Sequence, residues 1–151
     1  MDTMLRISEA DAIALHGLAL LAGRPGRRTM MKMIAETLEV SPHHLYKVME
    51  RLKQAGLVWG TPGPWGGYKL AKPSNEVTLL EIYEAMEGKL RPRDCLMENR
   101  VCRGRKCVLG DLLVRMNREF RDYLAGAKLS EFKHQYPVGN GGKHEKKHRK
   151  H

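Results

Sequence analysis

Three cysteines lie close together in the second half of the chain. Cys95 and Cys102 are separated by six residues, and Cys102 and Cys107 by four. Thiolate sulfur binds iron–sulfur clusters and zinc, so this segment is compact enough to fold around one cluster or one metal ion. Structural zinc sites usually contain a C-x-x-C pair, which this chain lacks, and the basic residues between the cysteines favour thiolates. The alternative is three unrelated thiols.

The charge of the chain favours a polyanionic partner. The 151 residues carry a formal net charge of +10, of which the C-terminal run KHEKKHRKH supplies +4 and residues 1–142 supply +6. No apolar run approaches the roughly 20 residues of a membrane span, and the N-terminus has no signal-peptide pattern. We therefore expect a cytoplasmic protein without a membrane partner. No acid–base pair or phosphate loop indicates an enzyme or a small-molecule substrate.

The stretch from residue 34 to residue 70 predicts a winged helix-turn-helix. Ser41 is a good N-cap and Pro42 suits the first helical position, so a helix begins there after a turn. Apolar residues at helical spacing face the core, which leaves a polar, mostly basic face that fits a DNA major groove. The short apolar segments that flank GTPGPWGG suit a two-stranded wing. The predicted fold class is mainly α with a small β-wing.

The remaining elements are also helical. Ser8 with Asp11, and Thr78 with Glu81, form capping boxes that begin two further helices, and Asp111 is expected to cap a last amphipathic helix. That helix has too little of its own domain to cover it, so we expect a symmetric homodimer. The predicted organisation is a DNA-binding domain, a cysteine-rich cluster-binding loop, a dimerisation helix and a disordered basic tail, over residues 1–88, 89–109, 110–136 and 137–151.

The chain resembles the bacterial regulators typified by IscR and NsrR. The resemblance covers about residues 5–125 and rests on IAETLEVSPHHLYKVMERLKQAGLV, on the G-P-x-G-G-Y element at 63–68, and on three cysteines after the helix EVTLLEIYEAMEG. It implies a dimeric transcription factor, here a repressor, that binds an inverted-repeat operator in double-stranded DNA. It also implies a 2Fe-2S or 4Fe-4S cluster that senses iron or cluster supply, nitric oxide or redox state. The alternative is a cofactor-free regulator whose thiols are redox-active or structural.

The resemblance also implies where a fourth cluster ligand comes from. Three thiolates leave a cluster one ligand short, and the family supplies the fourth either after the third cysteine or from the first helix, often of the partner subunit. Val108, Leu109 and Gly110 cannot ligate. Where NsrR-like members have a carboxylate this chain has an alanine, so His16, one turn later, is the preferred ligand and Asp11 the reserve. The alternative for His16 is an ordinary half-buried or exposed histidine.

The same resemblance nominates DNA contacts on the helix-turn-helix and the wing. Tyr46 and Lys47 match the base-contacting face together with His43, and the start of the preceding helix offers phosphate contacts. Pro62 stands where the family often has an arginine just before the wing. Trp65 occupies the wing tip and either contacts DNA or covers the hairpin. The full predicted set is Arg28, Lys32, Ser41, His43, Tyr46, Lys47, Arg51, Gly63 and Trp65.

Overall fold

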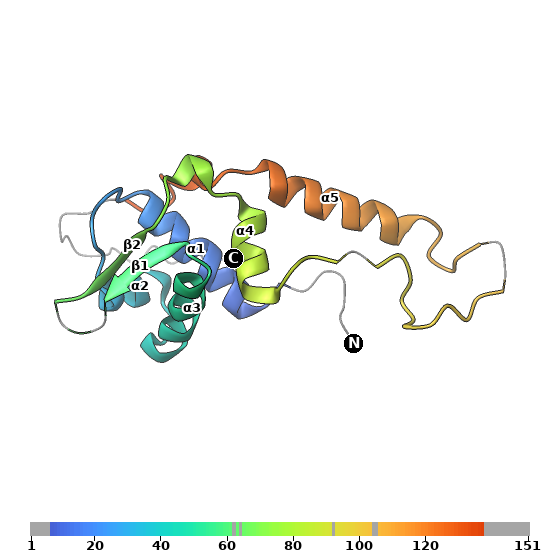
Figure 1. Cartoon of the computed structure of the whole chain (residues 1–151), viewed down its shortest axis with the longest axis horizontal. Helices are drawn as coiled ribbons and strands as arrows, with labels where there is room; N and C mark the ends of the chain where they lie inside the picture. The colour runs from blue at the N-terminus through green and yellow to red at the C-terminus, as the bar shows by residue number, and fades with distance from the viewer. Residues whose placement is uncertain (1–6, 62, 64, 92, 104–105, 138–151) are drawn as a thin grey trace, which may run out of the picture.

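The computed structural model describes residues 7–61, 63, 65–91, 93–103 and 106–137. Apart from Pro137, the predicted tail lies outside the described residues. Within them, five α-helices, two β-strands and two 3-10 helices follow in the order α1–α2–α3–β1–β2–η1–α4–α5–η2 (Figure 1). This mainly helical architecture with one two-stranded sheet confirms the predicted fold class.

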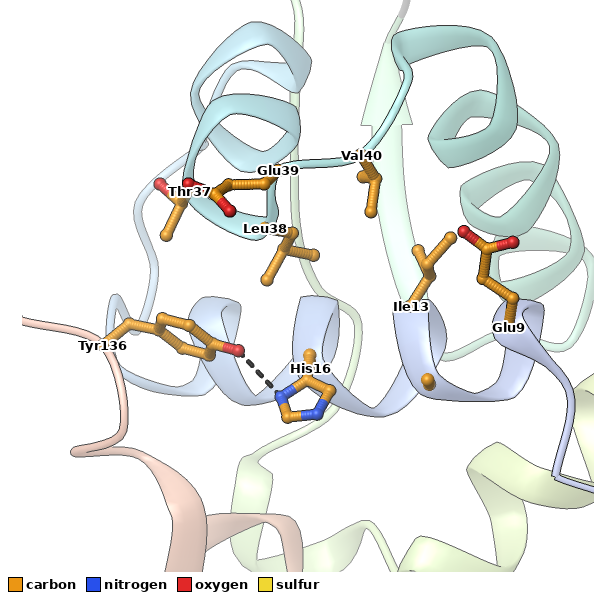
Figure 2. A pocket seen from close by; sticks show the side chains of 9 residues that line it. Glu9, Ile13, His16, Thr37, Leu38, Glu39, Val40 and Tyr136 are labelled. Atoms are coloured by element: carbon orange, nitrogen blue, oxygen red, sulfur yellow. Dashed lines mark hydrogen bonds between the residues drawn. The ribbon is translucent and has the colours of Figure 1, made fainter. Parts of the chain in front are cut away.

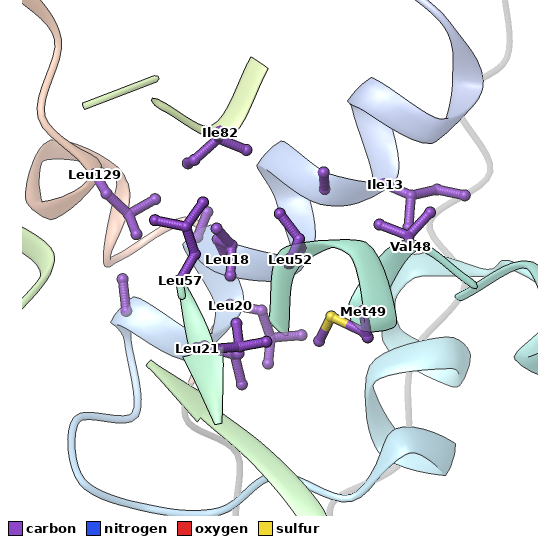
Figure 3. Close-up of a cluster of buried hydrophobic side chains, with 14 of the residues drawn as sticks. Ile13, Leu18, Leu20, Leu21, Val48, Met49, Leu52, Leu57, Ile82 and Leu129 are labelled. Carbon is purple, nitrogen blue, oxygen red and sulfur yellow. The ribbon is translucent and has the colours of Figure 1, made fainter. Parts of the chain in front are cut away.

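The core forms around α1 (Glu9–Ala22), which is buried on most of its surface. Helices α3 (Pro42–Gln54) and α4 (Leu79–Glu87) pack against it, and the apolar face predicted for α3 points inward (Figure 3). Each fully buried leucine or isoleucine adds about 1.5–3 kcal/mol relative to exposure. The fully buried aliphatic and methionine side chains are Leu18, Leu21, Ile34, Leu45, Val48, Met49, Leu52, Val58, Val77, Ile82 and Leu129.

The helix starts follow the predicted caps. The Ser8 hydroxyl accepts from the Asp11 N–H at 3.2 Å, and the Ser8 N–H donates to Asp11 Oδ2 at 2.7 Å, which completes the capping box of α1. Thr78 and Glu81 form the same arrangement at α4. Ser41 Oγ accepts from the His44 N–H at 3.1 Å and caps α3. These caps satisfy backbone donors that a helix start leaves unpaired.

The helix-turn-helix joins α2 (Met31–Leu38) to α3. Glu39 takes a left-handed conformation with φ 55°, and the Val40 N–H donates to the Ala35 carbonyl at 3.0 Å. This closes α2 and turns the chain toward Ser41, as the sequence predicted.

The wing consists of β1 (Val58–Thr61) paired antiparallel with β2 (Gly67–Leu70). Thr29 adds a short bridge on the other edge of β2, exchanging backbone hydrogen bonds of 2.8 and 2.9 Å with Tyr68. Two glycines allow this packing. A Cβ at Gly60 would lie 2.2 Å from the Tyr68 ring, and one at Gly67 would lie 2.9 Å from the Thr29 carbonyl oxygen. The glycines and tyrosine of the wing therefore form a tightly packed hairpin base.

The last long helix, α5 (Leu112–Gly126), is shorter than the predicted dimerisation segment at 110–136. Its C-terminal half packs on α4 through an edge-to-face contact of Phe120 with Tyr83, and its N-terminal end lies farthest from the core (Figure 1). Residues 127–136 are not a continuation of the helix. Two backbone hydrogen bonds hold the start of this segment against the core: the Leu79 N–H donates to Ala127 O at 3.0 Å, and the Leu129 N–H donates to Val77 O at 2.8 Å.

The predicted cap of α5 also differs from the structure. Asp111 stands at the N-cap position, but its side chain makes no cap hydrogen bond. Its carboxylate instead lies 3.2 Å from Arg115 Nε, one turn along the helix. Within the described part of the chain, no helix is long and apolar enough to cross a membrane.

Candidate DNA interface and cysteine segment

The outer face of α3 begins at its capped N-terminus. Pro42 at the first helical position and the Ser41 cap hold this end in place, while the opposite face is buried in the core. His43, Tyr46 and Lys47 are exposed on the first two turns. A polar face at the N-terminal end of a capped helix is the geometry with which recognition helices contact base edges. The structure thus brings these three predicted residues to one accessible surface.

Arg51, further along α3, is placed differently. Its Nη1 donates to the carbonyl oxygen of Met86 at 2.9 Å, near the end of α4. A charged hydrogen bond of this kind is stronger than a neutral one, and it satisfies a carbonyl that the end of α4 would leave unpaired. The structure therefore engages Arg51 in helix packing, and we leave it out of the DNA surface that we propose. Ser41 likewise uses its hydroxyl as the helix cap.

The loop before α2 connects to the wing. Arg28 is exposed, and its Nη1 lies 3.5 Å from Thr61 Oγ1 on β1. Lys32 is also exposed, with its ammonium 4.0 Å from the Glu36 carboxylate one turn away. An exposed pair of this type is worth little, so Lys32 stays available to a phosphate. Arg28 therefore lies just before the helix-turn-helix, and Lys32 lies on the first turn of its first helix.

The wing carries two tryptophans in different settings. Trp59 on β1 faces its cross-strand partner Lys69, whose Nζ lies 5.1 Å from the indole centroid. Trp65 lies in the turn between the strands, where Gly63 adopts φ 99°, and its side chain is 94% exposed. Trp59 was not among the predicted residues, although alternation along β1 was a signal that could have placed it on the outer face.

The cysteine segment lies away from this core. It runs from the end of α4 to the start of α5, at the far side of the molecule from α1 (Figure 1). The three thiols are free; Cys95 is partly buried, and Cys102 and Cys107 are exposed. Asn117 of α5 anchors the segment by donating to the carbonyl of Arg93 at 2.6 Å. Over the described residues, no three His, Cys, Asp or Glu side chains are close enough to hold a metal ion.

His16 lies on α1 rather than beside the cysteines of its own chain. Its Nδ1 is 2.7 Å from the hydroxyl of Tyr136, and the two rings meet edge to face (Figure 2). The two residues border a cavity of about 320 Å³ between α1 and the turn after α2, where Leu38 and Val40 form an apolar wall. Sequence reasoning missed Tyr136, because the contact joins residues 120 positions apart.

Asp11, the reserve ligand, is buried in the capping box of α1. Its residue is 1% exposed, one oxygen accepts from the Ser8 N–H, and the other has no hydrogen-bond partner among the described residues. Burial raises the pKa of Asp11 above its ordinary value of 3.8, and the nearby Glu87 carboxylate adds to this, although the Ser8 N–H opposes it. Ligation by Asp11 would require this cap to open, whereas His16 is exposed.

Comparison with known proteins places these features in one family. The Rrf2 family, described as "Iron-dependent Transcriptional regulator", matches residues 7–135. The match spans the helix-turn-helix, the wing, the cysteine segment and the returning C-terminal segment.

Individual relatives agree with this match. The chain is 30% identical over 113 residues to a Neisseria meningitidis protein named as a presumed HTH-type transcriptional regulator, covering 75% of this chain and 76% of the relative. It is 34% identical over 102 residues to the HTH-type transcriptional regulator NsrR of Bacillus subtilis, covering 63% and 69%. Among solved structures, CymR, the global cysteine regulator of B. subtilis, matches with a TM-score of 0.74 and 27% identity, covering 89% of this chain and all of CymR.

Proposed function

Because this chain belongs to the Rrf2 family of transcriptional regulators, we propose that it is a cytoplasmic, homodimeric repressor whose affinity for an inverted-repeat operator depends on an iron–sulfur cluster. DNA binding follows from the family. The family match also confirms the prediction that the chain is a transcriptional regulator and not an enzyme. The observation that carries the proposal is the capped helix α3. It presents His43, Tyr46 and Lys47 outward beside a wing, on a chain of net charge +10.

The outer face of α5 supports the dimer. Four apolar side chains on this helix are 38–61% exposed: Leu112, Val114, Met116 and Tyr123. The helix touches its own core through Phe120 and Leu124. Leu112, Met116 and Tyr123 are spaced by four and seven residues and so share one face of the helix, whereas Val114 lies on the other side. An exposed apolar face of this kind can be buried by a second copy of itself. Two α3 helices related by a two-fold axis then read two half-sites of an inverted repeat.

The donor chemistry of the cysteine segment fits an iron–sulfur cluster. Cys95, Cys102 and Cys107 form no disulfide, and the positive charges of Arg100, Arg103 and Lys106 between them would offset the negative charge of a thiolate-ligated cluster. When bound, a cluster supplies reversible redox and nitric oxide chemistry. The cysteines would hold it, and the exposed segment would let a signal reach it.

His16 remains our proposed fourth ligand, from the partner protomer. Within one chain α1 and the cysteine segment lie apart (Figure 1), so a fourth ligand from α1 must come from the second copy. The contact of His16 Nδ1 with Tyr136 suits this role. If Nδ1–H donates to the tyrosine oxygen, Nε2 keeps the lone pair that binds a metal, and the tyrosine fixes the orientation of the ring.

A cofactor-free thiol regulator is the second candidate. Cys102 and Cys107 lie on the surface, so oxidants in solution can reach both thiols. In addition, CymR, whose structure matches over 89% of this chain, is described as a cysteine regulator. This candidate keeps the DNA surface and the dimer but needs no iron.

One titration separates the two candidates. A high-affinity duplex is first selected from a random DNA pool with anaerobically purified protein. Its affinity is then measured by fluorescence anisotropy before and after iron removal by a chelator, under reducing conditions throughout. We expect operator affinity to change at least about tenfold, which is a typical allosteric coupling. Equal affinities for iron-containing and iron-free protein would favour the thiol regulator.

A further inference from the structure

The tryptophan at the wing tip is almost fully exposed among the residues that the structure describes. Trp65 is 94% exposed and lies beyond the last paired residues, Thr61 and Gly67. A packed tryptophan buries about 150–250 Å² of its surface, whereas Trp65 leaves nearly all of its side chain in solvent. Trp59 is the tryptophan that lies against a hairpin side chain, that of Lys69. Packing among the described residues of the hairpin therefore gives no reason for an indole at position 65.

Contacts with the rest of the fold hold the paired strands of the hairpin in place. Tyr68 pairs with Thr29 through two backbone hydrogen bonds and lies against Gly60, where no side chain would fit. Arg28 reaches Thr61 at the end of β1. The Leu57 N–H donates to the carbonyl of Leu52 at 3.0 Å, which joins the wing directly to the end of α3. The paired strands that carry the tip are therefore fixed to the end of α3.

We propose that Trp65 reads the minor groove beside the half-site bound by α3 and selects A·T base pairs there. This inference rests on the proposed operator binding. When α3 occupies the major groove, the tip of a hairpin fixed to its C-terminal end reaches the neighbouring backbone and minor groove. Arg28, which reaches Thr61 at the turn end of β1, supplies positive charge toward phosphates.

The selectivity follows from the chemistry of the indole. The indole N–H is a donor and has no acceptor. The minor-groove edge of an A·T pair presents only acceptors, whereas a G·C pair adds the exocyclic amine of guanine, which is itself a donor and projects into the groove. The apolar face of the indole packs on deoxyribose, as apolar side chains do in other minor-groove proteins. A donor-only aromatic side chain therefore favours A·T pairs.

Base analogues test this reading directly. The base pairs under the tip are located on the selected duplex by adenine N3 methylation protection that wild-type protein gives and Trp65→Ala loses. Duplexes carrying A·T, G·C or inosine·C at those pairs are then compared by anisotropy. Inosine lacks the 2-amino group of guanine, so we expect affinity to fall about tenfold with G·C and to return with inosine·C.

The variants separate the indole N–H from the apolar ring. Trp65→Phe should bind the A·T duplex about threefold to tenfold more weakly and should lose the preference for A·T over G·C. Trp59→Phe, the matched control on the same hairpin, should bind like the wild type. Circular dichroism and the sedimentation coefficient should be unchanged in both, since Trp65 is exposed.

Each other outcome overturns a defined part of the account. A Trp65→Phe protein that keeps the full A·T preference would refute the reading by Trp65 and leave operator binding intact. A Trp65→Ala protein that loses dimerisation but keeps its DNA affinity per dimer would show that the tip contacts protein. Failure of wild-type protein to select any duplex would refute operator binding itself.

Discussion

The core of this molecule and its cysteine-bearing arm differ in how completely their side chains are buried and their helix starts are capped. The core, from α1 to α4 with the wing, buries Leu18, Leu45, Leu52 and Ile82 completely and closes the starts of α1, α3 and α4 with side-chain caps. The arm, comprising residues 89–111 and α5, leaves Val108 94% exposed and begins its helix without a cap. The core buries its apolar side chains within one chain, whereas the arm exposes thiols and apolar side chains that a partner could cover.

This difference assigns separate tasks to the two regions. A core that is complete in one chain can carry DNA recognition with a fixed geometry. An arm with few buried contacts belongs to the low-stability end of a structure, where ligand-dependent ordering takes place. We therefore expect a second copy and a cofactor to act on the arm, and the following substitutions test that division.

The largest effect should come from a cavity in the core. Leu52→Ala removes a fully buried side chain of α3 and should lower the free energy of unfolding by about 2–5 kcal/mol. Val108→Ala, an aliphatic truncation at an exposed position of the arm, should change it by less than about 0.5 kcal/mol. Urea unfolding followed by circular dichroism measures both. Equal losses would break the comparison, because they would show that the arm is packed as tightly as the core.

The next effect concerns DNA rather than stability. Lys47→Ala should weaken binding to the selected operator about tenfold, or ~1.4 kcal/mol, since the lysine lies on the exposed N-terminal half of α3. Lys53→Ala is the matched control, because Lys53 lies at the other end of the same helix, 3.9 Å from Glu50. Gel-shift titration checks both. Unchanged affinity in Lys47→Ala would remove this residue from the recognition surface.

The two helix starts give a smaller but closely matched pair. Thr78→Ala deletes the side-chain cap of α4 and should cost about 1 kcal/mol of unfolding free energy. Asp111→Ala changes the same position of α5, where only an exposed pair with Arg115 is lost, and should cost at most about 0.5 kcal/mol. A larger loss for Asp111→Ala would show that this carboxylate has a further role in the arm.

The smallest expected effect is a change in pH dependence within the core. Because the pKa of Asp11 is raised above 3.8 in the folded state, its contribution to stability is fully present below pH 3.8 and is lost as the pH rises through the folded value. Asp11→Asn keeps an acceptor for the Ser8 N–H but does not ionise. The variant should therefore lose less stability than wild type between pH 4 and pH 7 in thermal unfolding.

Glu81 provides the opposite sign in the other capping box. Burial alone would raise its pKa, but the Lys72 ammonium at 2.9 Å and the Thr78 N–H lower it overall. Its contribution is therefore present above its ordinary value of 4.5 and is lost as the pH falls through the folded value. Glu81→Gln should reduce the loss of stability on acidification. If Asp11→Asn and Glu81→Gln shift the pH profile in the same direction, one of the two assignments is wrong.

The predicted features that the structure confirms are local ones. The caps at Ser8, Ser41 and Thr78 depend on residues within three positions, so their spacing in the sequence is enough to find them. The fold class follows in the same way from helical periodicity and a glycine-rich hairpin. Burial of the α3 apolar face was predictable because helical spacing alone decides which side chains share a face.

The features that sequence reasoning missed join distant parts of the chain. Arg51 was expected on the DNA face, but its partner is a carbonyl on another helix. The contact of His16 with Tyr136, and the return of residues 127–136 to the core, depend on where α5 ends and how the chain turns back. No local pattern encodes such contacts.

Iron and acid-labile sulfide analysis, with a visible absorption spectrum, tests the central claim most directly. Wild-type protein purified without oxygen should contain near-equal iron and sulfide, and Cys102→Ser should lose both while keeping the thermal unfolding of the core. Val101→Ala, an exposed neighbour, serves as the control and should keep the iron. Colourless, iron-free wild-type protein that still binds its operator after anaerobic reconstitution would contradict the account.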